Sequence, residues 1–154
     1  IQILGRVNNH RVYKYIRRDY VNQVQNLDKY KVYLSGASGT GNFGETIAPP
    51  ILSEPGIGAT ETFISVGTLN TRNEAEAVLK YIKTKFARCL LGVLKSTQAN
   101  TPEKWKYVPL QDFTSKSDID WTQSIHGIDQ QLYRKYGLTD TEVQFIEENV
   151  KPME

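Results

Sequence analysis

The sequence predicts an α+β fold, with a strand-rich amino-terminal half and a glycine loop, then one long amphipathic helix, then a helical carboxy-terminal segment. Three observations lead to this prediction. β-branched and aromatic residues dominate short runs in the first half, four glycines fall within residues 36–44, and apolar residues recur at helical spacing in the second half. Strands that come first and helices that come later favour α+β over an alternating α/β order.

The predicted strands occupy residues 1–4, 11–20, 31–35 and 60–66. Gly5, Asn8 and Asn9 are turn formers and separate the first strand from the second. The second strand alternates in part, so one of its faces is expected to be basic and aromatic. The strand at 31–35 leads directly into the glycine loop.

The clearest predicted helix begins at Asn70 or Thr71, either of which can act as its N-cap, and runs to about Val93. Glu74 and Glu76 lie in its first turn, where the helix dipole favours acids. The apolar residues cover one broad face. On the opposite face we expect exposed basic residues, namely Lys80, Lys83, Arg88 and Lys95.

After the long helix, residues 105–110 are predicted as a short strand and 118–121 as a loop. Two more helices follow, at 125–136 and 139–150, with stop signals at Gly137 and Pro152. Thr139 and Glu142 have the spacing of a capping box at the start of the last helix.

At 154 residues and 17.5 kDa the chain has the length of one domain, which we divide into an α/β body (1–113) and a helical extension (114–154). It begins at Ile1 without an initiator Met or a signal peptide, so we expect a segment of a longer protein. No run approaches the 18 apolar residues of a membrane span. The single Cys89 excludes an internal disulfide, and a cytoplasmic location is the expectation.

The net charge of +2 conceals a strong segregation along the sequence. Residues 1–44 carry seven basic and two acidic side chains, a balance of +5, and residues 72–107 carry eight and three, again +5. Residues 108–154 carry four basic and nine acidic side chains, a balance of −5. Such asymmetry lets one face attract a polyanion, although it is also compatible with solvated faces that keep the domain in solution.

The glycine loop resembles a phosphate-binding turn only superficially. It lacks the Gly-Lys-Ser/Thr ending of a nucleotide-binding loop, and Pro49 and Pro50 stand where a helix would have to follow. Its polar side chains can instead meet the phosphates or base edges of a large partner, or the loop can be a mobile surface segment.

Catalytic residues are not evident. Cys89 lies on the apolar face of the long helix and is expected to be a core residue, and His10 and His126 have no companion motif. Asp118 and Asp120 suit a solvated turn better than a cation site, and no acid followed by an acid-x-lysine strand indicates a nuclease. We therefore predict no catalytic, cofactor-binding or metal-binding residue in the chain.

The basic segments, their tyrosines and the glycine loop combine into a candidate surface for nucleic acid. Arg17 and Asn42 are expected to read bases, and Lys83 and Lys95 to meet phosphates. The full set of predicted DNA-binding residues is Arg17, Arg18, Lys31, Ser38, Thr40, Asn42, Lys80, Lys83, Arg88 and Lys95.

Five strings of residues carry a resemblance to a known family. They are Ile-Leu-Ser-Glu-Pro at 51–55, Thr-Glu-Thr-Phe-Ile-Ser-Val-Gly at 60–67, Ala-Val-Leu-Lys-Tyr-Ile-Lys-Thr-Lys-Phe-Ala-Arg at 77–88, Lys-Tyr-Val-Pro-Leu-Gln-Asp-Phe at 106–113, and Gln-Leu-Tyr-Arg-Lys-Tyr-Gly-Leu-Thr at 131–139. Together they resemble the carboxy-terminal target-recognition region of bacterial type II restriction-modification enzymes that contain an adenine-specific DNA methyltransferase.

This resemblance implies that the chain recognises a DNA sequence and is noncatalytic in isolation. It implies as partners double-stranded DNA and an upstream methyltransferase domain of the same polypeptide. The cofactors that it suggests for the upstream part are S-adenosylmethionine and, as a second candidate, Mg. The Asn-Pro-Pro-Tyr type of methyltransferase motif is absent from this sequence. Two alternatives stay open: a nuclease or other catalytic domain of the same system, and a domain that docks its subunits.

Overall fold

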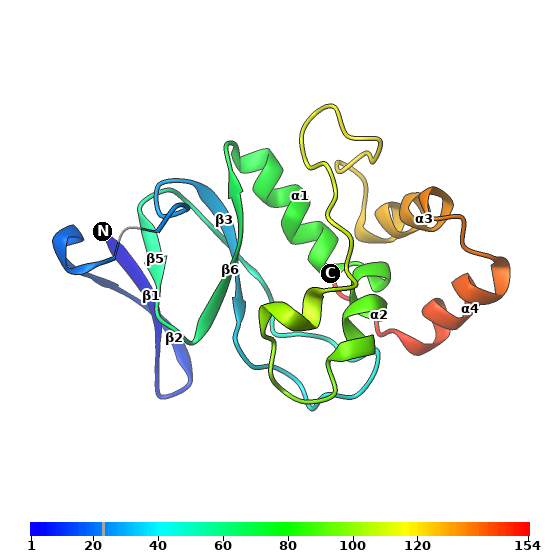
Figure 1. Ribbon diagram of the computed structural model, residues 1–154, viewed down its shortest axis with the longest axis horizontal. Coiled ribbons are helices and arrows are strands. Elements are labelled where there is room, and N and C mark those ends of the chain that lie inside the picture. Colours follow the sequence, from blue (N-terminus) through cyan, green and yellow to red (C-terminus); the bar gives the residue numbers. More distant parts are fainter. Residues whose placement is uncertain (23) are drawn as a thin grey trace.

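A long hairpin begins the chain and forms most of the first sheet (Figure 1). In this computed structural model, which describes residues 1–22 and 24–154, β1 (Gln2–Val7) pairs antiparallel with β2 (His10–Tyr15) and parallel with β5 (Ile57–Ala59). The order β2-β1-β5 leaves β2 at an edge of the sheet. The predicted strand at 11–20 is too long, because the chain turns into a short 3₁₀ helix, η1 (Arg18–Tyr20), after Tyr15.

The second sheet is antiparallel and has the order β4-β3-β6. Its central strand, β3 (Tyr30–Ser35), is the most deeply buried in the protein and precedes the glycine loop. The two neighbours are β4 (Ile51–Ser53) and β6 (Phe63–Leu69). The predicted strands at 31–35 and 60–66 are thus confirmed in outline. The second of them, β6, begins and ends three residues later than predicted.

The prediction of one long helix is wrong, because the chain breaks it at Thr84. α1 (Arg72–Lys83) ends there and α2 (Lys85–Leu94) begins, since Thr84 has a ψ of 149°. The Thr84 hydroxyl donates to the carbonyl of Tyr81 and accepts from the backbone N–H of Ala87, so it ends one helix and caps the next. The predicted N-cap at the start of α1 is confirmed at Thr71.

The carboxy-terminal helices are α3 (Ile125–Lys135) and α4 (Asp140–Asn149). The predicted capping box is confirmed, because Thr139 accepts from Glu142 N–H while the Glu142 carboxylate accepts from Thr139 N–H. The predicted strand at 105–110 is wrong: a 3₁₀ helix, η2 (Pro102–Trp105), ends there and irregular chain follows.

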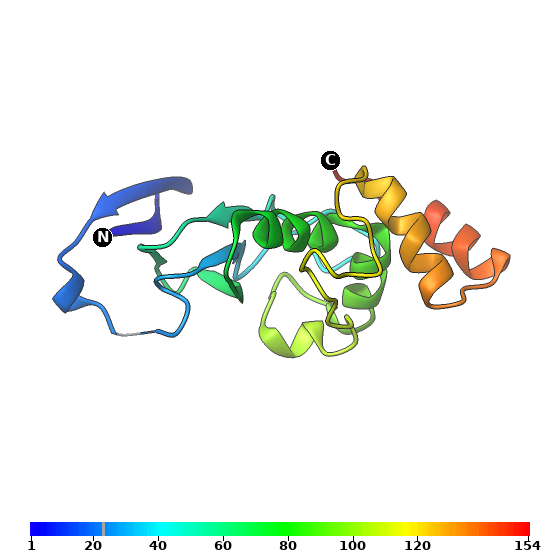
Figure 2. The same cartoon turned by 90° about the horizontal axis from the view of Figure 1, so that it is seen from above.

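Two clusters of the core lie on opposite sides of the helix pair α1 and α2, and a smaller third cluster joins β1 to the second sheet through Leu4, Tyr33 and Phe63. On one side, Val32 and Leu34 of β3 pack with Val78 and Ile82 of α1. On the other, residues of α3 and α4 such as Leu132 pack with α1 and α2. The fold is therefore α+β, with the hairpin at one end of the elongated molecule and α4 at the other (Figures 1 and 2).

Candidate nucleic-acid interface

The β1–β2 hairpin has a two-residue turn at Asn8 and Asn9. Both asparagines have positive φ, 48° and 63°, a conformation that asparagine tolerates better than most residues and that matches the twist of paired strands. This turn fixes the register, so that Val7 lies opposite His10 and Arg6 lies opposite Arg11. The hairpin therefore presents its basic residues at defined positions.

Arg6 and Arg11 form a cross-strand pair of like charges on one face of the hairpin. Partial burial, and then the Arg6 charge, lower the pKa of the Arg11 guanidinium. Each arginine contacts the body: Arg6 donates to the Ser35 hydroxyl at 2.7 Å, and Arg11 donates to the Pro49 carbonyl at 2.7 Å. Neither partner carries a charge. Because like charges directly opposite each other are destabilising, an anion placed beside them would relieve the repulsion.

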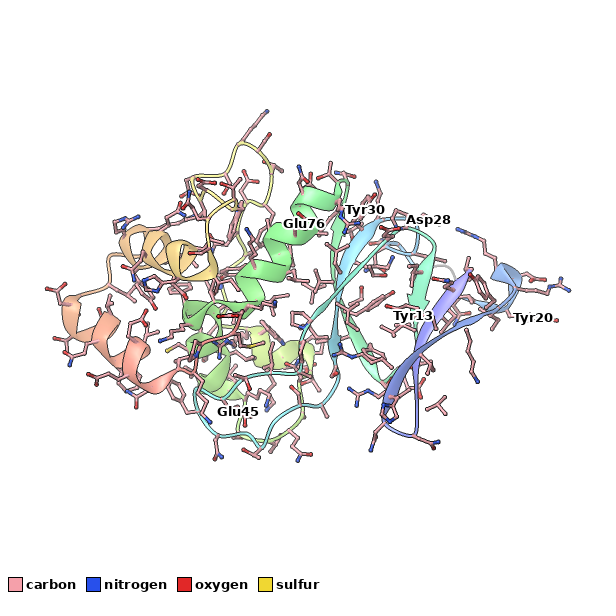
Figure 3. The ribbon with its side chains drawn as sticks, turned by 180° about the vertical axis from the view of Figure 1, so that it is seen from behind. Tyr13, Tyr20, Asp28, Tyr30, Glu45 and Glu76 are labelled. Carbon is pink, nitrogen blue, oxygen red and sulfur yellow. The ribbon has the colours of Figure 1, made fainter. Side chains whose placement is uncertain are left out.

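Several other side chains of the hairpin and of the residues that follow it are basic or aromatic and exposed. His10 and Lys14 lie on the opposite face from the arginine pair. Tyr15 and Tyr20 are 82% and 71% exposed, and Figure 3 shows Tyr20 at the extreme end of the molecule. Residues 1–18 contain five Lys or Arg side chains and no acid. Solvent-facing tyrosines among cations can contact sugars and stack on bases.

Arg17 and Arg18, two of the predicted DNA-binding residues, follow the hairpin and are exposed. Arg17 pairs with Asp19 at 2.6 Å and its guanidinium lies over the ring of Tyr20, while Arg18 pairs with Asp28. These hydrogen bonds lower the pKa of both carboxyl groups. The two arginines are thus near the hairpin, and each already has an acidic partner.

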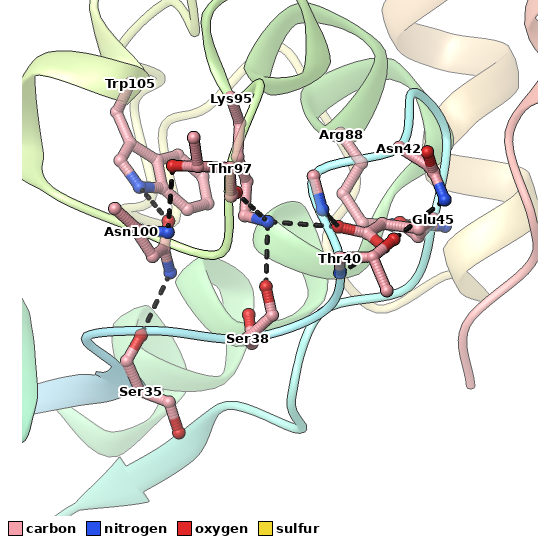
Figure 4. Close-up of polar contacts among 12 residues, drawn as sticks. Ser35, Ser38, Thr40, Asn42, Glu45, Arg88, Lys95, Thr97, Asn100 and Trp105 are labelled. Carbon is pink, nitrogen blue, oxygen red and sulfur yellow. Dashed lines mark hydrogen bonds and ion pairs between the residues drawn. The ribbon is translucent and has the colours of Figure 1, made fainter.

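The glycine loop folds around the carboxylate of Glu45 (Figure 4). This carboxylate accepts from the backbone N–H groups of Thr40 and Gly41, both at 2.8 Å, and from the Thr40 hydroxyl at 3.0 Å. Burial raises the pKa of Glu45, but these bonds and Lys95 outweigh it and lower the pKa to about 2. The backbone N–H groups of Thr40 and Gly41, which are the kind of donor that binds phosphate in a glycine-rich turn, therefore already donate to a side chain of the protein.

The predicted loop contacts, Ser38, Thr40 and Asn42, have internal roles in this arrangement. The Asn42 side-chain amide donates to the Thr40 hydroxyl at 2.8 Å, and the Ser38 carbonyl accepts from the Lys95 ammonium group. The loop needs glycine for packing, because a Cβ at Gly44 would lie 1.9 Å from the Asn149 carbonyl oxygen at the end of α4. The chain thus uses the loop to join the first half to the last helix.

The expectation that Arg88 and Lys95 lie on an exposed basic face is wrong, because both are buried. Lys95 donates to the Glu45 carboxylate at 3.1 Å and to the carbonyls of Ser38 and Thr97. Arg88 donates to the carbonyls of Lys83, Glu45 and Lys151, and burial lowers its pKa to about 10. The break at Thr84 restarts the helix, so the helical phase of α1 does not extend to these residues.

Lys31 is also buried rather than exposed. Its ammonium group donates to three carbonyls, those of Leu27, Lys29 and Glu54, at 2.9 to 3.1 Å. Burial lowers its pKa to about 8. Since an ammonium group has three donors, this contact set uses its full hydrogen-bonding capacity inside the protein.

Lys80 and Lys83 are partly exposed and tethered to the carboxy-terminal segment. Lys80 donates to three successive carbonyls, those of residues 121–123, at 2.8 to 3.3 Å. Lys83 donates to the carbonyl of Glu154. Of the predicted set, the structure brings Ser38, Thr40, Asn42, Arg88 and Lys95 together around Glu45 and places Arg17 and Arg18 beside the hairpin.

Comparisons with protein-family models, with curated proteins and with solved structures found no match.

The sequence analysis predicted a basic and aromatic strand at 11–20 but did not pair it with the first strand, and its predicted DNA-binding residues do not include Arg6, His10, Arg11 or Lys14. A signal was present, because two apolar or alternating runs separated by Asn8 and Asn9 are typical of a two-residue hairpin. A two-residue turn at Asn8 and Asn9 pairs Val7 with His10 and therefore Arg6 with Arg11, so this pair could have been predicted from the sequence alone.

Within residues 1–22 and 24–154, no group of three or more His, Cys, Asp or Glu side chains is arranged to hold a metal. In the same residues, no helix has the length and apolar character needed to span a membrane. Cys89 is half-buried, and burial raises the pKa of its thiol, which does not favour a reactive thiolate.

Proposed function

We propose that this chain is the DNA target-recognition domain of a cytoplasmic bacterial restriction-modification enzyme with an adenine-specific methyltransferase. The observation that carries the proposal is the arginine couple Arg6 and Arg11, which has no acidic partner among residues 1–22 and 24–154. It lies on an exposed hairpin, and the first 18 residues of the chain contain no acid. Such an arrangement is unfavourable in the isolated protein and becomes favourable when phosphate lies between the two charges.

The hairpin has a suitable shape for this role. A two-stranded β ribbon is one of the elements that the major groove of B-DNA admits. β2 lies at a sheet edge, with the basic and aromatic side chains of both faces open to a partner. In this proposal Arg11 and Lys14 contact phosphates, and Tyr15 and Tyr20 contact sugars or bases.

The rest of the proposal comes from the resemblance. In it, methylation belongs to an upstream domain that holds S-adenosylmethionine, with Mg needed only if the same enzyme also cleaves DNA. The present domain would be noncatalytic and would orient that methyltransferase on its target.

Fluorescence anisotropy with a labelled DNA duplex, measured across a series of salt concentrations, tests the DNA-binding part. The hairpin variant is Arg11→Ala with Lys14→Ala, and the charge-matched control is Lys104→Ala with Lys116→Ala. Because each lost phosphate contact lowers the slope of log affinity against log salt by about 0.9, the hairpin variant should lower the slope by about two. The control should keep the slope of the wild type.

Two outcomes would count against the proposal. One is no detectable binding at low salt by protein whose circular dichroism shows that it is folded. The other is an equal loss of affinity in the hairpin variant and the control, which would mean that net charge rather than the hairpin determines binding.

A further inference from the structure

A groove between α2 and α4 has no part in the proposed DNA contact. Its volume is about 490 Å³, and its lining includes Phe86, Cys89, Leu90, Leu138, Phe145 and Ile146. We call it the α2–α4 groove. It lies at the opposite end of the molecule from the hairpin (Figures 1 and 2).

Large apolar side chains are exposed along this groove. Phe145, which lines the groove from α4, is 51% exposed. Val93 lies just outside the lining, one helical turn beyond Cys89 and Leu90 on α2, and is 59% exposed. Phe43 of the glycine loop extends the surface, since its ring centroid lies 5.7 Å from that of Phe145. Contiguous exposed apolar residues from three segments are typical of a binding surface rather than of a solvated face.

The charges around the groove are one-sided. α4 carries four acids and no basic residue. Of these acids, Glu142 lines the groove and Glu148 lies three residues beyond Phe145 on the helix, whereas Glu147 lines a different pocket. On the α2 side, Lys85 is already paired with Glu147 at 2.6 Å, and Arg88 is buried. The single charged side chain in the groove lining is Glu142. A partner that combines an apolar stripe with cations therefore complements this surface, whereas DNA and anionic lipid are repelled.

The geometry also selects a conformation for the partner. The groove is bounded by two helices and the short connection before α4, so no sheet edge is available there for an added strand. An amphipathic helix instead places apolar side chains at i, i+3, i+4 and i+7 along one line, with its cations at the flanks. We infer that the α2–α4 groove binds a basic amphipathic helix of a protein partner.

The probe is a labelled synthetic helix with leucines at that spacing and lysines elsewhere, and its counterpart has glutamate in place of lysine. Anisotropy with the whole chain should show saturable binding of the lysine peptide and binding weaker by about tenfold or more for the glutamate peptide. Phe145→Ser and Val93→Ser should each weaken binding of the lysine peptide by a similar factor. Leu110→Ser is the matched control, because Leu110 is 90% exposed outside the groove, and it should leave affinity unchanged.

A charge reversal tests whether the partner helix has to be basic. Glu148→Lys should weaken binding of the lysine peptide, while Glu61→Lys, far from the groove in sequence and fold, should not. The inference is overturned if folded protein does not bind the lysine peptide or binds both peptides equally, or if groove and control variants behave alike. Self-association that Phe145→Ser abolishes, measured by sedimentation, would overturn it in favour of a second copy, and competition by duplex DNA would overturn it in favour of nucleic acid.

Discussion

At the scale of single residues, Lys31 shows how a cation can stabilise the fold from within. Its ammonium group joins the turn at Leu27 and Lys29 to the end of β4 through Glu54, using backbone carbonyls as acceptors. Truncation would leave these carbonyls without their donor in a buried place. Lys31 therefore has a structural role that differs from the phosphate contact its charge suggested.

We expect Lys31→Met to lower the free energy of unfolding by roughly 2 to 4 kcal/mol, because several buried acceptors lose their donor. DNA affinity of the folded variant should stay close to that of the wild type. Urea unfolding measures the first effect and anisotropy the second. Lys29→Met is the control, since Lys29 makes one exposed hydrogen bond, to Asn70. A folded Lys31→Met protein that has lost DNA binding would show that Lys31 contacts DNA, as the sequence analysis predicted.

Glu45 predicts a pH dependence. Its pKa in the folded protein is about 2 against an ordinary value of 4.5, so its ionised form is stabilised by folding. That contribution is fully present above about pH 4.5 and is lost as pH falls toward 2. Glu45→Gln should lower the free energy of unfolding by about 2 kcal/mol at pH 7. The stability of this variant should also fall less steeply than that of the wild type as the pH is lowered from 4.5 toward 2. Thermal unfolding between pH 7 and 2 measures this, with the exposed Glu61→Gln as control; an unchanged acid limb contradicts the assignment.

At the scale of elements, the start of α2 depends on a side chain from α3. The Asp129 carboxylate accepts from the backbone N–H groups of Lys85 and Phe86, at 3.0 and 2.9 Å. Burial raises its pKa to about 6, although the two N–H groups act in the opposite direction. At neutral pH it is thus mainly ionised and caps the second helix just after the break at Thr84.

Asp129→Ala should therefore lower the free energy of unfolding by roughly 2 to 3 kcal/mol, because two buried N–H groups lose their acceptor. Ser124→Ala, which removes the exposed cap of α3, should cost about 1 kcal/mol. Chemical denaturation of both variants compares the two caps. Equal and small losses would mean that water replaces the Asp129 carboxylate at the start of α2.

Elements with strong local signals could be predicted from the sequence. The capping box at Thr139 and the helix stop at Gly137 follow from short-range chemistry, and both are present. The break at Thr84 could not be predicted from periodicity, because the apolar spacing continues across it. The missed 3₁₀ helix at 102–105 begins with Pro102, and a proline fits the first turn of a helix as well as it ends a strand.

The candidate site was harder to predict than the elements. Charge patterns assigned Arg88 and Lys95 to the surface, but whether a cation is buried depends on carbonyls and carboxylates that are distant in sequence, such as those of Glu45 and Lys151. Local register, by contrast, is sufficient to pair Arg6 with Arg11. The register of the hairpin could therefore be predicted from the sequence, whereas the burial of Arg88 and Lys95 by hydrogen bonds to distant residues could not.

At the scale of the whole molecule, opposite charges lie at opposite ends. The hairpin is basic, α4 is acidic, and the helix pair α1 and α2 lies between them (Figure 2). Asp140→Asn combined with Glu148→Gln should leave DNA affinity within about twofold at physiological salt, where screening acts over about 8 Å. Anisotropy measures the effect. A large loss of affinity would place DNA on α4 and contradict the arrangement proposed above.

The same arrangement gives the molecule an electric dipole along its long axis. In the field of a polyanion, such a dipole experiences a torque that turns the hairpin toward the phosphates before contact. Because orientational search normally lowers association rates far below the diffusion limit, this alignment increases the fraction of collisions that are productive. In the proposed DNA complex, the charge separation would thus act on the speed and orientation of approach, before any hydrogen bond with DNA is formed.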